Sequence, residues 1–365
     1  MKVAIVHDWL TGMRGGEKVL EVLCERFPDA ELFTLLHVPQ SVSPTIERHP
    51  IHTSTLQHLP FSRRYYRQYL PIFPALIERF DLSRFDFVIS SSHCVAKSAM
   101  APAGVPHVCY CHTPMRYAWD QFDAYFGPDR VGRLPSALLR PVMRRLARWD
   151  RETAGRPTCY VTNSQHVAGR IRRYYNREAI VVYPPVDTGF FRPEPVEPER
   201  FALVVSALVP YKRLELAIDA AREAGLPLTI AGSGPDRAAL ERRAAGAPVN
   251  FLGRVTDTDL RALYCRAAVF VQTGEEDFGI APVEAQACGR PVVAYARGGA
   301  VETVVAGETG LLVDQQTASA FAGALREALG RRWNPAAIRA HAERFGRERF
   351  GDEIEAIVRA RMNGQ

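Results

Sequence analysis

The sequence lacks an apolar run long enough to cross a membrane. Its longest candidate, residues 201–209, contains Ser206 and stops at Pro210, whereas a membrane-spanning helix needs about 20 apolar residues. The opening segment MKVAIVHDWL has only a short apolar run before His7, which favours a buried first strand over a signal peptide. We therefore expect a soluble protein that stays in the cytoplasm.

Cysteine is present without the spacing of a disulfide framework. The seven cysteines are an odd number, which favours a reducing compartment. His107, Cys109 and Cys111 would share one face of a predicted strand, where they could hold a metal or serve as small core residues. Because their spacing matches no common zinc pattern, we expect no metal ion and no cofactor.

Charge and apolar content exclude a disordered chain and point to two domains. Hydrophobic residues make up 47% and charged residues 24% of the 365 residues, which is typical of globular proteins, and the length suits two cores. Residues 1–183 hold 24 lysines and arginines against 16 acidic residues, a formal charge of +8, whereas residues 184–365 carry −2. The first half is therefore the part expected to meet an anionic surface, either nucleic acid or phospholipid.

Short apolar segments alternate with helical segments along the whole chain. Such alternation is typical of parallel sheets covered by helices on both faces. The predicted strands are residues 3–6, 85–90, 107–111, 159–162, 202–205, 228–231, 250–252, 269–271 and 291–295, and the predicted helices are 17–26, 164–175, 212–223, 260–267, 281–288 and 336–362. Five prolines between Pro184 and Pro198 separate two such series, as expected of a domain boundary.

The alternation predicts an α/β protein with two doubly wound, Rossmann-like domains. Residues 1–185 would form the first domain and residues 186–345 the second, with a C-terminal helix over residues 346–365 packing back on the first. Two such domains are expected to enclose a cleft at the carboxyl ends of their strands.

Two segments of the second half carry residues suited to a phosphorylated sugar ligand. Gly232 and Gly234 follow a predicted strand, where a turn is as plausible as a phosphate-binding loop. In the segment 275–284, Glu276 lies in a loop and Glu284 one turn inside a helix. Such carboxylates can hold sugar hydroxyls, and the helix N-terminus can face a diphosphate. The alternative, a solvated pair beside a helix cap, is the one that we accept for Glu275.

The spacing Glu276-x7-Glu284, with Phe278 and Gly279 inside it, resembles the signature of glycosyltransferase family 4. The resemblance extends over nearly the whole chain. The further matching segments are residues 6–10, 15–18, 110–114, 163–164, 183–187 and 209–212. Within the family, the chain is most similar to bacterial O-antigen and exopolysaccharide mannosyltransferases. The resemblance implies the GT-B fold and a retaining reaction.

The resemblance also implies roles for individual residues. Glu276 would hold hydroxyls of the donor sugar, Glu284 the nucleotide ribose, and His112 the sugar near its reacting carbon. Lys212 and the backbone N–H of Gly16 would meet the diphosphate. The remaining predicted donor-site residues are Gly15, Arg213, Gly232, Gly234, Asp277, Phe278, Gly279 and Ile280.

The chain departs from the family pattern at one position. Many relatives have an arginine five residues before the lysine, where this chain has Ala207. Arg213, next to Lys212, is either its replacement or a surface charge. An arginine can hold a phosphate by two hydrogen bonds, whereas a lysine acts as a point charge. The two alternatives therefore differ in the number of cationic contacts with the diphosphate.

Two further motifs each have two interpretations. Asp257-Thr258-Asp259 spells a metal-binding DxD motif but directly precedes a predicted helix, so we expect its residues to be helix caps. Residues 130–148 contain six arginines, interleaved leucines and no acidic residue. This pattern is typical of a basic amphipathic element on anionic lipid, or of a solvated helix face. Nucleic acid is disfavoured because no binding module's motif is present.

These features together predict a retaining hexosyltransferase. It would use a GDP- or UDP-hexose, with GDP-mannose as one candidate, and a lipid-linked saccharide acceptor, in polysaccharide or glycolipid synthesis. It would be a cytoplasmic enzyme that acts at the inner face of the cell membrane. The rival hypotheses are a sugar-nucleotide epimerase, a saccharide-binding protein without catalysis, and an inverting enzyme whose base is His7, paired with Asp8.

Overall fold

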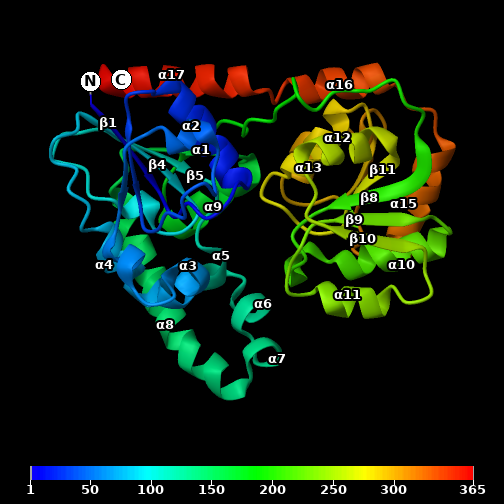
Figure 1. The fold of residues 1–365 in the computed structure, drawn as a ribbon, viewed down its shortest axis with the longest axis horizontal. Helices are drawn as coiled ribbons and strands as arrows, with labels where there is room; N and C mark the ends of the chain where they lie inside the picture. Colours follow the sequence, from blue (N-terminus) through cyan, green and yellow to red (C-terminus); the bar gives the residue numbers. More distant parts are fainter. Residues whose placement is uncertain (1, 365) are drawn as a thin grey trace. The chain divides into compact units, whose positions relative to one another are not determined.

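The computed structural model describes residues 2–364 and separates the chain into two compact units (Figure 1). The first unit consists of Met1–Pro185 together with Phe350–Gln365, and the second of Val186–Arg349. Each unit is built around one parallel sheet, so the predicted α/β architecture is confirmed. Among residues 2–364, no helix is both long and apolar enough to span a bilayer.

The sheet of the first unit has seven strands in the order β3-β2-β1-β4-β5-β6-β7. Its strands are β1 (Val3–His7), β2 (Glu31–Thr34), β3 (Ile51–Thr53), β4 (Phe87–Ser92), β5 (His107–Cys111), β6 (Cys159–Thr162) and β7 (Ala179–Val181). All neighbouring strands are parallel, and His7 at the end of β1 lies opposite Ser91 of β4. The carboxyl ends of the central strands therefore meet at one edge.

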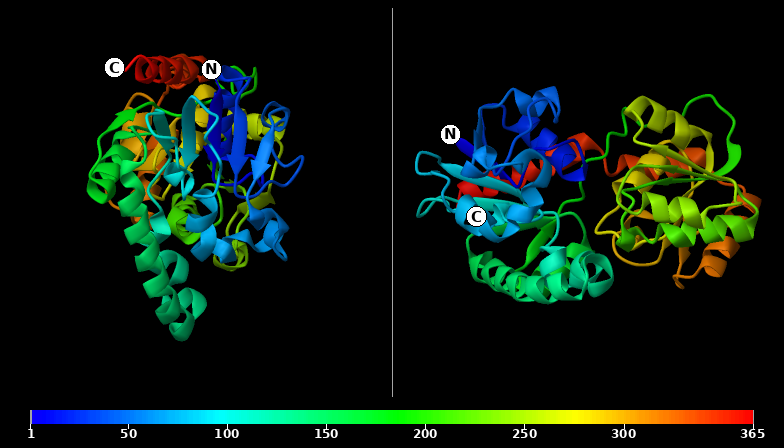
Figure 2. Two further views of the ribbon diagram at one scale, coloured as in Figure 1. Left: turned by 90° about the vertical axis from the view of Figure 1, so that its left-hand side faces the viewer. Right: turned by 60° about the horizontal axis from the view of Figure 1, so that its bottom comes forward.

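Helices cover both faces of this sheet (Figure 2). They are α1 (Gly15–Arg26), α2 (Pro44–Glu47), α3 (Ser62–Tyr65), α4 (Phe73–Ile77), α5 (Arg116–Trp119), α6 (Phe122–Phe126), α7 (Pro128–Val131), α8 (Arg133–Glu152), α9 (Gln165–Tyr175) and α17 (Arg347–Met362), with the 3-10 turns η1 (Thr55–His58), η2 (Tyr66–Ile72), η3 (Ala96–Ser98) and η4 (Thr153–Gly155). Phe350, Ile354 and Val358 of α17 share a buried core with α1 and the central strands. On the other face, Met143 and Leu146 anchor α8.

A buried ion pair ties α8 to the loop that follows β4. Lys97 of η3 lies 3.1 Å from the Asp150 carboxylate of α8, and the two side chains are almost fully buried. The Lys97 ammonium also donates to the Asp150 carbonyl at 2.7 Å and to the Thr153 hydroxyl at 3.0 Å. The other carboxylate oxygen accepts hydrogen bonds from Trp119 and Tyr175, each at 2.8 Å. Both charges are therefore satisfied inside the protein, as a buried pair requires.

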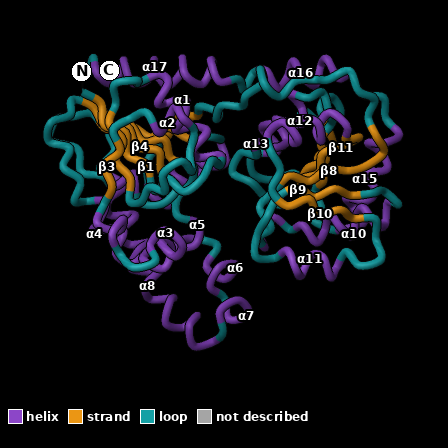
Figure 3. Tube along the Cα trace, viewed as in Figure 1, coloured by secondary structure: helices purple, strands orange, loops and turns teal. Residues whose placement is uncertain are grey.

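The second unit repeats the same architecture, with strands between layers of helices (Figure 3). Its sheet has the order β10-β9-β8-β11-β12-β13. The strands are β8 (Glu199–Val205), β9 (Leu228–Ala231), β10 (Val249–Gly253), β11 (Ala267–Gln272), β12 (Val292–Tyr295) and β13 (Gly310–Val313). The helices are η5 (Pro210–Lys212), α10 (Leu214–Ala224), α11 (Arg237–Arg243), α12 (Asp257–Arg266), α13 (Ile280–Ala287), α14 (Ala300–Thr303), α15 (Ala318–Gly330) and α16 (Pro335–Glu343).

Three predicted boundaries were wrong for identifiable reasons. The strand predicted over residues 85–90 runs from Phe87 to Ser92, because Phe85 closes a turn by donating its N–H to the Leu82 carbonyl. The helix predicted from Lys212 begins at Leu214, because Arg213 has a left-handed backbone with φ of 53° that cannot continue a helix. The single helix predicted over residues 336–362 is divided into α16 and α17.

Candidate active site

The first unit gathers three polar side chains at the carboxyl edge of its sheet. His7 ends β1, Ser91 lies near the end of β4, and His112 follows β5. Because these strands are neighbours, the side chains meet: the Ser91 hydroxyl lies 3.1 Å from His7 Nδ1 and 2.9 Å from His112 Nε2. The arrangement joins two imidazoles through one hydroxyl.

The amino-terminal turn of α1 stands against these two rings. A Cβ atom on Gly16 would lie 3.7 Å from both His112 Nε2 and His7 Cε1, which is ordinary van der Waals contact, so this turn lies directly beside both rings. Gly15 and Gly16 are the first residues of α1, where backbone N–H groups lack helical partners and attract anions. Glu17 turns back, with Oε2 accepting the Arg14 N–H at 3.0 Å and Oε1 3.9 Å from His7 Nε2.

Burial and neighbouring charges set the protonation of this cluster. Burial, with the electrostatic effect of the neighbouring His93 and His7 side chains, holds the pKa of His112 well below its ordinary value, so this ring is neutral near pH 7. Burial raises the pKa of Glu17, but contacts with His7 and His93 outweigh it and leave that pKa lowered. The edge therefore presents a neutral His112 beside an ionised, buried Glu17.

Asp8 does not pair with His7, so the structure lacks the pair on which the rival inverting hypothesis relied. The Asp8 carboxylate accepts backbone N–H groups of residues 93–96 at 2.7–2.9 Å and lies 3.1 Å from His93 Nδ1. Four backbone donors on one carboxylate bind it firmly to the turn after β4. Asp8 thus shapes the backbone there, and the carboxylate that faces His7 is that of Glu17.

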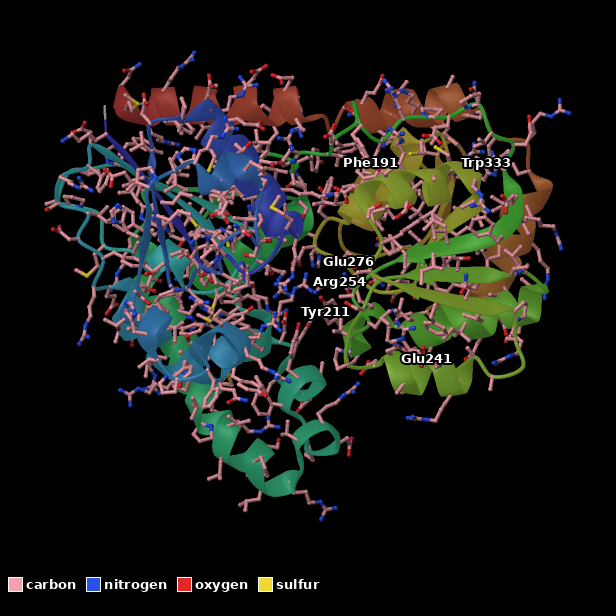
Figure 4. The ribbon with its side chains drawn as sticks, in the orientation of Figure 1. Phe191, Tyr211, Glu241, Arg254, Glu276 and Trp333 are labelled. Carbon is pink, nitrogen blue, oxygen red and sulfur yellow. The ribbon has the colours of Figure 1, made fainter. Side chains whose placement is uncertain are left out.

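The second unit brings Lys212 and Glu276 together at the carboxyl edge of its own sheet. Lys212 lies in η5 after β8, Glu276 lies in the loop after β11, and the ammonium pairs with the carboxylate. Their side chains are 15% and 17% exposed, so ligands can reach both groups. Figure 4 shows Glu276 beside Tyr211 and Arg254 at this edge.

Glycines make this pairing possible. A Cβ atom on Gly274 would lie 2.7 Å from the Lys212 Cα atom, and one on Gly298 would lie 2.2 Å from the Glu276 carbonyl oxygen. Both distances are far below van der Waals contact, so any side chain would push the loops apart. Gly299 also donates its N–H to the Glu276 carbonyl at 2.8 Å. The loop after β12 thus holds Glu276 in place.

The rest of the segment 275–284 is divided between binding and packing. Glu284 of α13 is 3% exposed and accepts a hydrogen bond from the Tyr264 hydroxyl at 2.9 Å. The Phe278 side chain is buried against the Phe345 ring, with centroids 5.6 Å apart, so it supports the loop from inside. Gly279 caps α13 with φ of 90°, Ile280 is the first helical residue, and Asp277 is 9% exposed.

The glycines of the turn at residues 232–234 allow a close packing contact. Cβ atoms on Gly232 and Gly234 would lie 1.9 Å from the Ser206 carbonyl oxygen and 2.3 Å from the Leu208 carbonyl oxygen, respectively. Their absence lets the loops after β8 and β9 touch. Ser233, between them, accepts a hydrogen bond from Arg254 Nε at 3.3 Å.

Arg213 makes its contacts with neighbouring side chains of the second unit. Its guanidinium group pairs with Glu215 and donates to Gln316 Oε1 at 3.1 Å. Arg254, which follows β10, is exposed beside Ser233 at the edge that also carries Glu276. Arg254 is thus a further cation at this edge, and sequence analysis did not single it out.

Within residues 2–364, no group of three or more His, Cys, Asp or Glu side chains could hold a metal ion. Cys109 and Cys111 belong to an apolar core. His107 contacts the Ser90 hydroxyl at 2.8 Å, and burial lowers its pKa to about 3. Asp257 and Asp259 form the first turn of α12, whereas the cap itself is Thr256, which accepts the Asp259 N–H.

Two family models account for most of the sequence. The model described as Glycosyltransferase Family 4 matches residues 13–190, and that described as Glycosyl transferases group 1 matches residues 186–348. The chain belongs to glycosyltransferase family 4. The resemblance seen in the sequence is thereby confirmed.

A curated relative and two solved structures are similar to this chain. The chain is 35% identical over 210 residues to the D-inositol 3-phosphate glycosyltransferase of Mycobacterium tuberculosis, a match that covers 49% of this chain and 43% of that relative. The Anabaena protein HepE, solved with UDP and glucose, has a TM-score of 0.73 at 17% identity, covering 98% of this chain and 99% of HepE. The lipopolysaccharide outer core galactosyltransferase WaaB has a TM-score of 0.69 at 16% identity, covering 99% and 100%. This family 4 protein therefore has the GT-B fold.

Proposed function

We propose that this protein is a retaining glycosyltransferase that moves a hexose from a nucleoside diphosphate sugar to a saccharide. The observation that carries the proposal is the meeting of Lys212 and Glu276 at one strand edge, with Glu284 on the adjoining helix. A cation suits the diphosphate, and carboxylates suit sugar and ribose hydroxyls. The arrangement thus offers complementary groups for both ends of a nucleotide sugar.

The proposed chemistry uses fixed charges and dipoles. Departure of the nucleoside diphosphate develops negative charge, which the Lys212 ammonium would stabilise. Arg254 would add a second cation. His112, kept neutral by burial, would contact the sugar by a hydrogen bond. The departing phosphate would take the acceptor proton on the face of attack, which retains the anomeric configuration.

The donor and acceptor classes are supported by the relatives. HepE was solved with UDP and glucose, and WaaB is named as a galactosyltransferase of the lipopolysaccharide outer core. We therefore propose a UDP- or GDP-hexose donor, with GDP-mannose among the candidates, and a lipid-linked saccharide acceptor in polysaccharide or glycolipid assembly.

Product stereochemistry tests the proposal. The purified protein is incubated with a lipid-linked saccharide and a panel of α-linked UDP- and GDP-hexoses, and the product is analysed by proton NMR. We expect an α-glycoside, because in the proposed reaction the departing phosphate takes the acceptor proton on the face of attack. A base on the opposite face, which inversion would need, then takes no part. A β-glycoside would refute retention. Sugar interconversion without acceptor would instead support an epimerase, and binding without turnover a saccharide-binding protein.

Helix α8 supports a further proposal, that the first unit contacts anionic membranes. Met143 and Leu146 point into the core, whereas Leu134 and Leu138 are 71% and 64% exposed. Figure 2 shows this amino-terminal half of α8 extending beyond the sheet. The exposed arginines along the segment are Arg130, Arg133, Arg140, Arg144, Arg145 and Arg148. Exposed leucines among arginines suit the interface of an anionic bilayer.

Vesicle sedimentation tests the membrane proposal. We expect the protein to bind vesicles rich in anionic lipid and to be released by salt, which screens the charges. Replacing Leu134 and Leu138 by serine should weaken binding by at least about tenfold, since each buried leucine contributes roughly 1.5–3 kcal/mol. Ile180→Ser removes an exposed apolar side chain from β7 and should change nothing. Equal binding to neutral vesicles would contradict the proposal.

A further inference from the structure

One buried nitrogen of the first unit is left without a hydrogen-bond partner. His7 is 1% exposed, and its Nδ1 atom contacts Ser91, but its Nε2 atom has no partner within hydrogen-bond distance among the described residues. The nearest charged atom is Glu17 Oε1 at 3.9 Å. A buried imidazole nitrogen aimed at a buried carboxylate needs an explanation, and the proposed transfer chemistry does not use it.

We propose that Glu17, His7 and Ser91 form a relay that determines which ring nitrogen of His112 carries the proton. Glu17 and His7 are then positioning residues, since they act on His112 through the Ser91 hydroxyl. The tautomer of His112 can be measured on the protein alone. The inference that this tautomer matters for sugar binding rests on the proposed function.

The direction of the relay follows from counting protons. The Glu17 carboxylate can only accept, so the neutral His7 ring places its hydrogen on Nε2, toward Glu17. His7 Nδ1 is then an acceptor and takes the single hydroxyl hydrogen of Ser91. The Ser91 oxygen is left to accept from His112, whose hydrogen must therefore lie on Nε2. The other nitrogen of His112, Nδ1, becomes a hydrogen-bond acceptor.

The opposite tautomer of His7 reverses the relay. With its hydrogen on Nδ1, His7 donates to the Ser91 oxygen, and the Ser91 hydrogen turns to His112 Nε2. His112 then carries its own hydrogen on Nδ1 and becomes a donor there. Besides Glu17, the titratable or charged groups around the relay are His112, His93 with its partner Asp8, and Arg67 from η2.

The relay predicts the kind of ligand atom that His112 recognises. With Nδ1 as an acceptor, the neutral ring binds a hydroxyl that donates its hydrogen, as a sugar hydroxyl does. With Nδ1 as a donor, the same ring would instead favour a carbonyl or phosphate oxygen. The proposed sugar contact therefore requires the relay in the direction set by the ionised Glu17 carboxylate.

The Glu17→Gln variant tests the relay directly. A glutamine keeps the shape, and its oxygen can still accept the Arg14 N–H, which leaves its NH2 group facing His7 Nε2. His7 must then carry its hydrogen on Nδ1, and every bond of the relay reverses. We expect the imidazole ¹⁵N NMR spectrum of ligand-free protein at pH 8 to show His112 protonated on Nε2 in the wild type and on Nδ1 in Glu17→Gln. Loss of signals in His112→Gln assigns the resonances.

Two further variants complete the test. Ser91→Ala interrupts the relay, so the His112 tautomer should be the same whether residue 17 is Glu or Gln. Glu25→Gln makes the same chemical change on the exposed face of α1 and should leave His112 as in the wild type. Should Glu17→Gln not fold, the wild-type protein still tests the proposal, because an Nδ1-protonated His112 at pH 8 would overturn it.

Kinetics then connect the relay to transfer. We expect Glu17→Gln to lower kcat by about tenfold, the effect of one lost hydrogen bond, with KM for the donor little changed. Ser91→Ala interrupts the relay, so in that background Glu17→Gln should leave kcat unchanged. A tenfold loss of kcat caused by Glu17→Gln in the Ser91→Ala background would contradict a link to transfer. The NMR result does not depend on turnover, so failure of the proposed function would leave it interpretable.

Discussion

Glu276→Gln is expected to lose most transfer activity and yet to bind a nucleoside diphosphate more tightly than the wild type. In the ligand-free protein the Lys212 ammonium is paired with the Glu276 carboxylate, so a diphosphate must displace that carboxylate. Glutamine removes the competing charge and frees Lys212. It also loses the charge-assisted bonds to the sugar, which contribute roughly 1.5–3 kcal/mol, or about ten- to a hundredfold in kcat.

Isothermal titration with UDP and GDP, together with transfer kinetics, measures both effects. Glu275→Gln is the matched control, because it makes the same change one residue away at an exposed position, and both parameters should stay near wild type. Lys212→Ala should show the opposite pattern in binding, with weaker affinity for the diphosphate. Weaker diphosphate binding in Glu276→Gln would show that the ion pair does not compete with the ligand.

Lys97→Met is expected to cause the largest loss of stability among single substitutions in the first unit. Methionine fills the space but leaves the Asp150 carboxylate buried without a counter-charge. Removing one partner of a buried pair typically costs about 3–5 kcal/mol. Urea denaturation followed by tryptophan fluorescence is suited to this measurement, because Trp119 donates to Asp150 and Trp149 stacks near the ammonium.

An exposed ion pair provides the control for this experiment. Arg172 and Glu178 are 67% and 76% exposed, and such surface pairs contribute little to stability. Arg172→Met should therefore leave the urea midpoint unchanged within error. A Lys97→Met midpoint equal to that of Arg172→Met would mean that the buried pair only offsets its own desolvation.

Most of the fold could be predicted because the strands are short apolar runs that alternate with helices. β5, β6 and β9 were predicted to the residue, since buried parallel strands have a clear composition. Helix starts were harder. The left-handed backbone of Arg213 could not be predicted from its residue type, because this conformation is rare for any residue other than glycine.

Residues of the candidate site could be predicted from the sequence only where they belong to a recognisable motif. The segment around Glu276 and Glu284 has a recognisable spacing, but its supports lie far away in sequence. Gly274 and Gly298 matter because two loops touch, and Ser91 matters because three strands end side by side. Such contacts depend on strand order and register, which the residues of one segment do not specify.

The orientation of α8 shows a related limit. Leu134 and Leu138 have the same chemistry as Leu146, and all three lie in one basic segment. Periodicity identifies an amphipathic helix but does not say how far the sheet beneath it extends. The structure shows that the sheet-facing core ends before the first two leucines are reached.

The return of α17 to the first unit reverses the usual order of events during synthesis. Domains generally fold from the N-terminus as the chain emerges, at about 5–20 residues per second. Here the core of the first unit is completed only by Phe350, Ile354 and Val358 of α17. The second unit, Val186–Arg349, is a contiguous stretch that is synthesised before those three residues. Translating that stretch takes roughly 10–30 s, during which the face of the first sheet that α17 will cover remains open to chaperones. The part of the protein that is made first is therefore the part that is finished last.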